Sequence, residues 1–486
     1  MRYKDIPVLD GGSWRKGGHL GELATPDGRL ALLRRIAEHP SPIVALQTPG
    51  GTVIAINSPE AMAEVLVEHA KVFEKAFMTR HTLAPLGGEG LFTAEGELWK
   101  AQRKLMSPMF QPSQIDAYGA DMIACTDRAL SRWPENTEFS MADETTRITM
   151  SIAGKTLFDA DTFSEADEIG HALTVALDWV ASQIAAPRSF FSAISYGMMR
   201  RASAHVPARL RTKLRSMAEG LTYPKYLRRA EDKQMLQAID KLDNYVAEMV
   251  RERRANPGAK HDLLSRLLGA YDDENQTRMS DKQLRDEVLT LFVAGHETTA
   301  TSLAWALYYL CKDSSMYALA RAEVDALRGK TPGREDLPRL GYLLRVFKES
   351  LRIMPPVYLT SRQPWKDVTI AGYEIPAGRP TLVSAYAAHY REDVWPNPTQ
   401  FDPDRFLPEN EAKRHKLAWL PFAAGPRVCI GNHFALMEGQ LVLARILQRF
   451  DVTLMGDDEP APLATLRPKH GVRVRVQARS NDTVRA

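Results

Sequence analysis

Apolar residues near the start of the chain follow the pattern of short β-strands. Residues 43–47 and 52–57 are β-prone and are separated by Thr-Pro-Gly-Gly, a sequence typical of turns, so they predict a hairpin. Ser58 is a suitable N-cap for a helix that begins at Pro59. From residue 96 to 270 the apolar positions recur at helical spacing, which predicts a middle region made mostly of helix.

The longest predicted helix follows this region. Ser280 and Gln283 form a capping box, and apolar positions at helical spacing continue from Leu284 to Leu310, so we expect one long, buried helix. A second helix, over residues 340–353, must end before Pro355, because the residue that precedes a proline is pushed out of the α region.

Short strands return late in the chain, over residues 368–370, 373–375 and 381–384. The predicted sheet therefore takes strands from both ends of the sequence. Because no linker, repeat or low-complexity tract divides the chain, we predict one domain over residues 1–486, mainly α with minor β. Within this domain, residues 1–42 form an N-terminal segment that precedes the core, residues 43–450 form the core, and residues 451–486 form a β-rich C-terminal tail.

Composition and charge exclude several classes of protein. The net charge of +3 is too small to produce an electrostatic field that would favour nucleic-acid binding, so nucleic acid is not expected as a partner. The 3 cysteines are too few and too scattered for a disulfide framework or a zinc site. The N-terminus does not resemble a signal peptide, and no apolar run is long enough for a transmembrane anchor, so a cytoplasmic location is expected.

One apolar segment, residues 183–199, ends in two arginines and leaves two interpretations open. It suits a helix pair with a buried loop, which we favour, or a lid that dips into lipid.

The strongest chemical signal is the loop over residues 422–431, which delivers Cys429 to the start of an apolar helix. A helix N-terminus offers unpaired N–H groups and a positive dipole potential, which would lower the pKa of the thiol and stabilise a thiolate ligand. Gly425 and Gly431 would let the backbone fold against a flat cofactor, and Arg427 would pair with an anionic group on it. Alternatively, Cys429 is a small buried hydrophobe.

This loop resembles the haem-binding signature of the cytochrome P450 family of haem-thiolate monooxygenases. Phe422, Gly425, Arg427, Cys429 and Gly431 match that signature, and the resemblance extends over residues 43–450. It implies haem b as the cofactor and Cys429 as the ligand of its iron.

A second matching segment lies on the long predicted helix. Ala294 and Gly295, followed by Glu297 and Thr298, resemble the family's oxygen-activation segment. The resemblance implies that Ala294 and Gly295 lie against the haem, where a mid-helix glycine would widen the groove that admits O2. It also implies that Glu297 and Thr298 route protons to bound oxygen. A zinc-protease helix is excluded, because position 300 is Ala.

Further matches concern charged residues. Glu349 and Arg352, with Arg405, resemble the family's buried ion-pair triad, which implies a structural role. Trp99 and Arg103 match a Trp-x-x-x-Arg motif that binds a haem propionate. The same role is implied for one further arginine, Arg362, and more weakly for Arg80 and His81.

The substrate pocket is less well defined by sequence. The segment 90–93 resembles bacterial fatty-acid hydroxylases of this family, which implies that Phe92 lies above the haem with Val357 nearby. Those relatives hold a fatty carboxylate with Arg and Tyr of the first hairpin, and neither is present here. A fatty-acid substrate therefore stays open but has no support at its anchor, and the broader expectation is a hydrophobic small molecule.

The resemblance implies insertion of one oxygen atom from O2, by hydroxylation or epoxidation. No flavin or iron–sulfur module is recognised, so electrons are expected from a separate ferredoxin or flavodoxin with its NAD(P)H-dependent reductase. Lys100, Arg103, Lys104 and Arg427 are candidate docking residues. Two alternatives stay open, namely a peroxide-driven peroxygenase and a haem-binding sensor or electron carrier without turnover.

Overall fold

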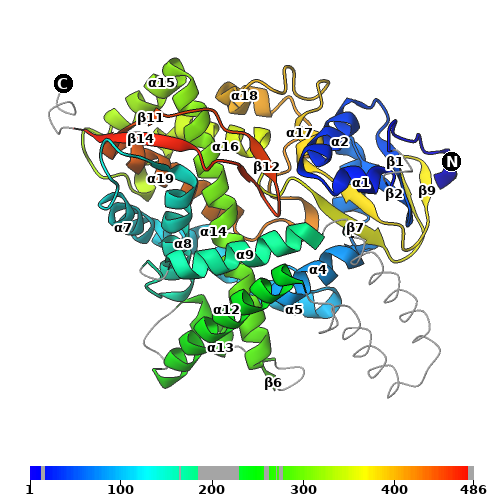
Figure 1. Cartoon of the computed structure of the whole chain (residues 1–486), viewed down its shortest axis with the longest axis horizontal. Helices are drawn as coiled ribbons and strands as arrows, with labels where there is room; N and C mark the ends of the chain where they lie inside the picture. The colour runs from blue at the N-terminus through cyan, green and yellow to red at the C-terminus, as the bar shows by residue number, and fades with distance from the viewer. Residues whose placement is uncertain are drawn as a thin grey trace.

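The computed structural model describes residues 1–12, 17–163, 166–183, 186, 229–256, 262–269, 271–272 and 277–479. Helices dominate it, and a central helix, α14 (Asp281–Lys312), runs through the middle of the molecule (Figure 1). The segment 183–199, interpreted above as a loop or lid, lies outside the described residues apart from positions 183 and 186.

The main sheet has five strands in the order β1-β2-β10-β7-β3. The first two form the predicted hairpin, β1 (Ile43–Thr48) and β2 (Gly51–Ile56), paired antiparallel. The late strand β10 (Thr381–Val383) pairs parallel with β2 and antiparallel with β7 (Thr360–Pro364). The other edge is β3 (Phe73–Lys75). The prediction that both ends of the chain supply this sheet is confirmed for the late strand β10. It is wrong for residues 368–370 and 373–375, which pair only with each other in a separate sheet.

Several smaller sheets accompany the main one. Strands β11 (Phe450–Leu454) and β14 (Arg473–Ala478) pair antiparallel, and β14 also pairs with β4 (Glu138–Ser140). The two-stranded sheets are β5–β6 (Tyr271–Asp272, Thr277–Arg278), β8–β9 (Val368–Ile370, Tyr373–Ile375) and β12–β13 (Pro460–Pro462, Leu466–Pro468).

Helix α14 begins where the sequence predicts. Ser280 Oγ accepts the Gln283 N–H (3.2 Å), and the Gln283 side chain accepts the Ser280 N–H (3.1 Å), which closes the capping box. Its apolar positions pack against α8 (Met141–Phe158), α16 (Gly341–Ile353) and α19 (Asn432–Arg449). Residues such as Trp305 and Leu307 are fully buried there, so α14 is the core of the domain.

The remaining helices surround this core. They are α1 (His19–Leu23), α2 (Pro26–Glu38), α3 (Pro59–Ala63), α4 (Phe77–Gly87), α5 (Gly96–Met106), α6 (Pro112–Ala117), α7 (Gly119–Leu130), α9 (Ala166–Gln183), α12 (Ala230–Ala255), α13 (Leu263–Gly269), α15 (Ser314–Asp325), α17 (Ala385–His389) and α18 (Pro408–Glu411). Among the described helices, none is long and apolar enough to cross a membrane.

Candidate active site

A cavity of about 1410 Å³ lies between α14 and the loop that carries Cys429. This volume exceeds the 300–1,000 Å³ of a typical ligand pocket, which leaves room for a large cofactor together with a second molecule. Most of the residues that the sequence singles out line it together: Phe92, Trp99, Arg103, Ala294, Gly295, Glu297, Thr298, Val357, Arg362, Phe422, Arg427, Cys429 and Gly431.

Cys429 is presented by a tight loop. A short 3-10 turn over Gly425–Arg427 is closed by a bond from the Val428 N–H to the Gly425 carbonyl (3.1 Å). The Cys429 N–H then donates to the Phe422 carbonyl (2.9 Å), which aims the side chain at the cavity. The residue is exposed to that space, so the interpretation of Cys429 as a buried hydrophobe is wrong.

Gly425 has a different role from the one expected. Its φ of +68° is in the left-handed region, and a Cβ there would lie 1.9 Å from the carbonyl oxygen of Leu66. Gly425 is therefore required for packing against the backbone beneath the loop, and it does not line the cavity. Gly431 does line it, with only Phe110 near its missing Cβ (3.9 Å).

The Cys429 thiol faces the cavity and is enclosed by protein on its other sides, and the resulting desolvation raises its pKa, although the Gly431 N–H and the Arg103 guanidinium act in the opposite direction. The expectation that the nearby helix would lower this pKa was therefore wrong, because desolvation outweighs those favourable groups. Coordination to a metal ion would deprotonate the thiol by itself.

Several cations line the cavity, and three of them lie close enough to lower one another's pKa. We call these three, Lys75, Arg362 and Arg427, the cavity cation cluster. Arg427 forms an ion pair with Glu95 and stacks over the Trp99 ring at 4.2 Å. Among the described residues, no carboxylate pairs with Lys75 or Arg362. They donate only to uncharged acceptors, Lys75 to the Leu91 carbonyl (3.2 Å) and Arg362 to the Ser361 carbonyl (3.0 Å) and the Thr360 hydroxyl (3.1 Å).

The electrostatics of this cluster show an excess of positive charge. Burial and the nearby Arg427 lower the pKa of Lys75 to about 7 and that of Arg362 to about 10. Buried cations are normally paired, so three cations with one carboxylate leave a place for an anionic group. The cavity thus fits a flat cofactor that carries carboxylates at its edge and a metal facing Cys429.

Arg103 makes a different contact from Trp99. Its Nη1 donates to the Val428 carbonyl (2.9 Å), next to Cys429, so it also braces the cysteine loop. Arg80 pairs with Glu74 (3.6 Å), and His81 stacks on Phe77 (5.2 Å between ring centroids). Neither Arg80 nor His81 is among the residues that line the cavity, so the structure does not support their expected contact with a propionate.

On the opposite wall, α14 presents two polar side chains. The Thr298 hydroxyl donates to the Ala294 carbonyl one turn earlier (2.9 Å). Glu297 is buried and accepts a hydrogen bond from the Thr465 hydroxyl (2.8 Å). The helix stays α-helical through Gly295, so the expected local widening is not observed. A Cβ on Gly295 would meet Ala153 at 3.5 Å, an ordinary packing distance.

The predicted ion-pair triad lies outside the cavity, with Glu349 and Arg352 on α16 and Arg405 on the 3-10 turn Pro403–Phe406. Arg352 donates to both carboxylate oxygens of Glu349 (2.7 and 2.8 Å), and both side chains are fully buried. Arg405 approaches Glu349 at 3.4 Å. The remaining N–H groups of Arg352 donate to three carbonyls, those of His389, Pro398 and Gln400. All five donors of Arg352 are thus satisfied.

Three residues near the cavity were not predicted from sequence. Lys75 and Glu95 belong to the charged edge described above, and a lone Lys on a short strand or a lone Glu before Trp99 gives no motif. Glu438 on α19 is completely buried beside Thr299, and burial raises its pKa well above the usual range. Its signal was available, because a Glu within an otherwise apolar helix face is unusual.

Comparison with known proteins agrees with this geometry. The family model for Cytochrome P450 matches residues 13–474. The chain belongs to the cytochrome P450 family. This P450 is 31% identical to cyclooctat-9-en-7-ol 5-monooxygenase of Streptomyces melanosporofaciens, over 93% of this chain and 92% of that protein. It is 29% identical to pentalenene oxygenase of Streptomyces avermitilis, over 87% of each.

Its fold matches that of solved P450 structures. The crystal structure of cytochrome P450DA heme domain superposes with a TM-score of 0.81 at 28% identity, over 98% of each chain. The predicted fold class, mainly α with minor β, is confirmed. The protein is a haem-thiolate cytochrome P450 monooxygenase with haem b as its cofactor.

Proposed function

We propose that this P450 hydroxylates or epoxidises a hydrophobic small molecule that it holds mainly by apolar contacts. The observation that carries the proposal is the lining of the cavity opposite Cys429. Phe92 and Val357 line the cavity and are 46% and 39% exposed, and Leu83, Leu86 and Val180 also line it. Exposed large apolar side chains inside a cavity favour an apolar ligand.

The names of the relatives agree with this substrate class. One acts on an alcohol, cyclooctat-9-en-7-ol, and another is named for pentalenene, and neither name contains an acid group. In this chain the hairpin positions that line the cavity include Thr52 and Val53, which offer no positive charge.

A second candidate, a substrate with a carboxylate, is favoured by Arg379. This arginine also lines the cavity, and its Nη1 donates to the Thr52 carbonyl (3.3 Å). A Cβ on Gly51 would lie 3.2 Å from the same nitrogen, so the guanidinium covers the hairpin. No carboxylate among the described residues pairs with it, which would leave it able to bind an acid.

In the proposed mechanism, Cys429 would ligate the iron, and Trp99, Arg427, Arg362 and Lys75 would hold the propionates. The haem, when bound, supplies the chemistry that activates O2 and transfers one oxygen atom. Thr298 would offer its hydroxyl to the cavity, kept in place by the Ala294 carbonyl. Glu297, held by Thr465 in a buried position, would route protons toward that hydroxyl.

We further propose that electrons come from a separate ferredoxin or flavodoxin with an NAD(P)H-dependent reductase. Of the candidate docking residues, Arg103 and Arg427 are engaged inside the molecule. Lys100 and Lys104 on α5 are exposed, although Lys100 pairs with Glu97 (2.7 Å), and they would attract an acidic partner.

The test is turnover with a surrogate ferredoxin, its reductase and NADPH, with limonene as a neutral hydrocarbon probe and lauric acid as an acidic probe. Oxidised limonene with little oxidised laurate supports the proposal. Oxidation of laurate alone, lost in Arg379→Met, would establish the second candidate instead. Product formed with peroxide alone would identify a peroxygenase. The absence of product with every probe and oxidant would favour a haem-binding sensor or electron carrier.

A further inference from the structure

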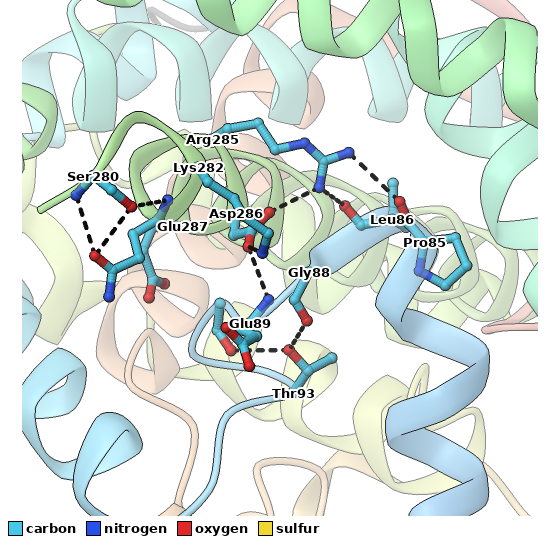
Figure 2. A network of polar contacts seen from close by, with 12 residues as sticks. Pro85, Leu86, Gly88, Glu89, Thr93, Ser280, Lys282, Arg285, Asp286 and Glu287 are labelled. Carbon is cyan, nitrogen blue, oxygen red and sulfur yellow. Dashed lines mark hydrogen bonds and ion pairs between the residues drawn. The ribbon is translucent and has the colours of Figure 1, made fainter. Parts of the chain in front are cut away.

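The first turns of α14 hold the loop that precedes α5 by its backbone. Arg285 Nη1 donates to the Leu86 carbonyl (2.9 Å), and the Asp286 carboxylate accepts the Glu89 N–H (2.9 Å), as Figure 2 shows. The next residue, Glu287, accepts the Leu91 N–H (2.9 Å). Three consecutive charged side chains of one helix therefore bind three separate points of the segment 86–91.

The loop is also shaped to fit this helix. Gly88 has a φ of +50°, and a Cβ there would lie 2.1 Å from the Asp286 carboxylate. A Cβ on Gly90 would lie 2.3 Å from the Thr290 hydroxyl and 2.5 Å from the Asp286 carbonyl. Only glycine fits at both positions, so the loop and the helix are in direct contact.

The contact at Leu91 involves a residue that lines the cavity. Glu287 accepts the N–H of Leu91, while Lys75 Nζ donates to its carbonyl (3.2 Å), so opposite charges hold both sides of this residue. Glu287 is fully buried, and its second oxygen has no hydrogen-bond partner among the described residues. A buried carboxylate with a free oxygen is a costly way to satisfy one N–H, which argues for a role beyond stability.

The residue after Leu91 is Phe92, whose side chain faces the cavity. The same helix carries Ala294 two turns beyond Glu287, since seven residues of helix span about 10 Å. A single rigid element thus fixes both the loop that presents Phe92 and the wall that presents Thr298.

We propose that Asp286 and Glu287 are positioning residues that set the selectivity of oxidation by fixing Phe92 over the cavity through the backbone of Glu89 and Leu91. This inference rests on the proposed function, because it assigns Phe92 to substrate contact. It predicts that loss of the Glu287 acceptor changes which atom of a substrate is oxidised, with the haem still bound.

The experiment compares the holoenzyme with Glu287→Leu, which removes the acceptor, and Glu287→Gln, which keeps an acceptor oxygen of the same reach. Glu89→Gln is the matched control, because the side chain of Glu89 is exposed and only its backbone makes the contact. Three quantities are measured, namely hydrogen exchange over residues 85–93, the dissociation constant of 4-phenylimidazole, and the ratio of limonene epoxide to limonene alcohols.

We expect Glu287→Leu to speed exchange over this segment about tenfold or more, since a protecting hydrogen bond is lost. It should also weaken 4-phenylimidazole binding and shift the product ratio several-fold, and Glu287→Gln should restore all three. In a Phe92→Ala background the Glu287→Leu change should no longer alter the ratio, because both act through one side chain.

Unchanged exchange in Glu287→Leu would overturn the proposed contact. Faster exchange with an unchanged ratio and unchanged 4-phenylimidazole affinity would show that the contact is structural and does not set selectivity. If the wild-type enzyme oxidises no probe, the proposed function fails. Exchange and 4-phenylimidazole binding then still decide whether Glu287 positions the cavity wall.

Discussion

Two arginine-rich regions of this P450 use similar side chains in opposite ways. In the triad of Glu349, Arg352 and Arg405, all five N–H groups of Arg352 donate to Glu349 and to backbone carbonyls. In the cavity cation cluster, Arg362 is buried and Lys75 is half-buried, and neither has a carboxylate partner among the described residues. A satisfied network serves the fold, whereas an incompletely paired one is prepared for a ligand. The difference separates structural from binding arginines in a single chain.

The largest effect is expected in the triad. Glu349→Gln leaves the charge of Arg352 buried without its counter-charge, which should cost about 3–5 kcal/mol of unfolding free energy. Urea unfolding monitored by circular dichroism measures it. Lys469→Ala, which breaks an exposed pair with Glu459, is the control and should change little. A Glu349→Gln variant as stable as the wild type would show that the triad does not stabilise the fold.

In the cation cluster, removal of a charge should have the opposite effect on stability from its removal in the triad. In the haem-free chain, Lys75 has a folded pKa of about 7 against 10.5 when unfolded. As the pH falls from about 10.5 to about 7, Lys75 becomes protonated in the unfolded chain before it does so in the folded chain. This difference lowers the free energy of unfolding progressively, and the full loss is reached below about pH 7. Lys75→Met should therefore be more stable than wild type at pH 6, on the order of 2–4 kcal/mol, with the gain vanishing toward alkaline pH.

Unfolding of both haem-free proteins at several pH values provides the measurement. Lys100→Met on the exposed face of α5 should keep the pH dependence of the wild type. A Lys75→Met variant that is less stable than wild type at low pH would mean that Lys75 is as well paired as Arg352.

The next largest effect is expected on haem retention, which should fall when a cation of the cluster is removed. Arg362→Met removes a buried cation that would bind a propionate, so the rate of haem release should rise about tenfold or more, as expected for a lost charge-assisted hydrogen bond. Transfer of haem to apomyoglobin measures that rate. Arg449→Met, at the far end of α19, is the control. Equal release rates for the two variants would exclude Arg362 from the haem site.

The smallest effect is expected at Arg405. It approaches Glu349 at 3.4 Å and donates to the Asn397 carbonyl (2.9 Å), so it is the outer member of the triad. Arg405→Met should cost about 1 kcal/mol, well below the cost of Glu349→Gln. An equal loss in both variants would show that the three residues act as one unit.

Local sequence signals predicted the elements and much of the site. The capping box of Ser280 and the turn after β1 have strong short-range signatures, and the motif around Cys429 is unusually specific. What failed depended on tertiary packing. The role of Gly425 follows from the approach of Leu66, which lies more than 350 positions away in the sequence. Burial, which no motif encodes, reversed the expected pKa direction for Cys429.

The contacts of the segment 86–91 were hidden for the same reason. Asp286 and Glu287 appear in the sequence as ordinary charges on a helix, and only the fold places the backbone of Glu89 and Leu91 beside them. Long-range contacts between side chain and backbone leave no periodic pattern, so a single sequence does not reveal them.

The most direct test of the account is the absorption spectrum of the reduced protein with carbon monoxide, compared between wild type and Cys429→Ser. We expect the wild type to show the long-wavelength Soret band of carbon monoxide opposite a thiolate, and Cys429→Ser to lose it. Arg362→Met should keep the band position with less bound haem. A thiolate band that persists in Cys429→Ser would contradict the assignment of Cys429 as the iron ligand.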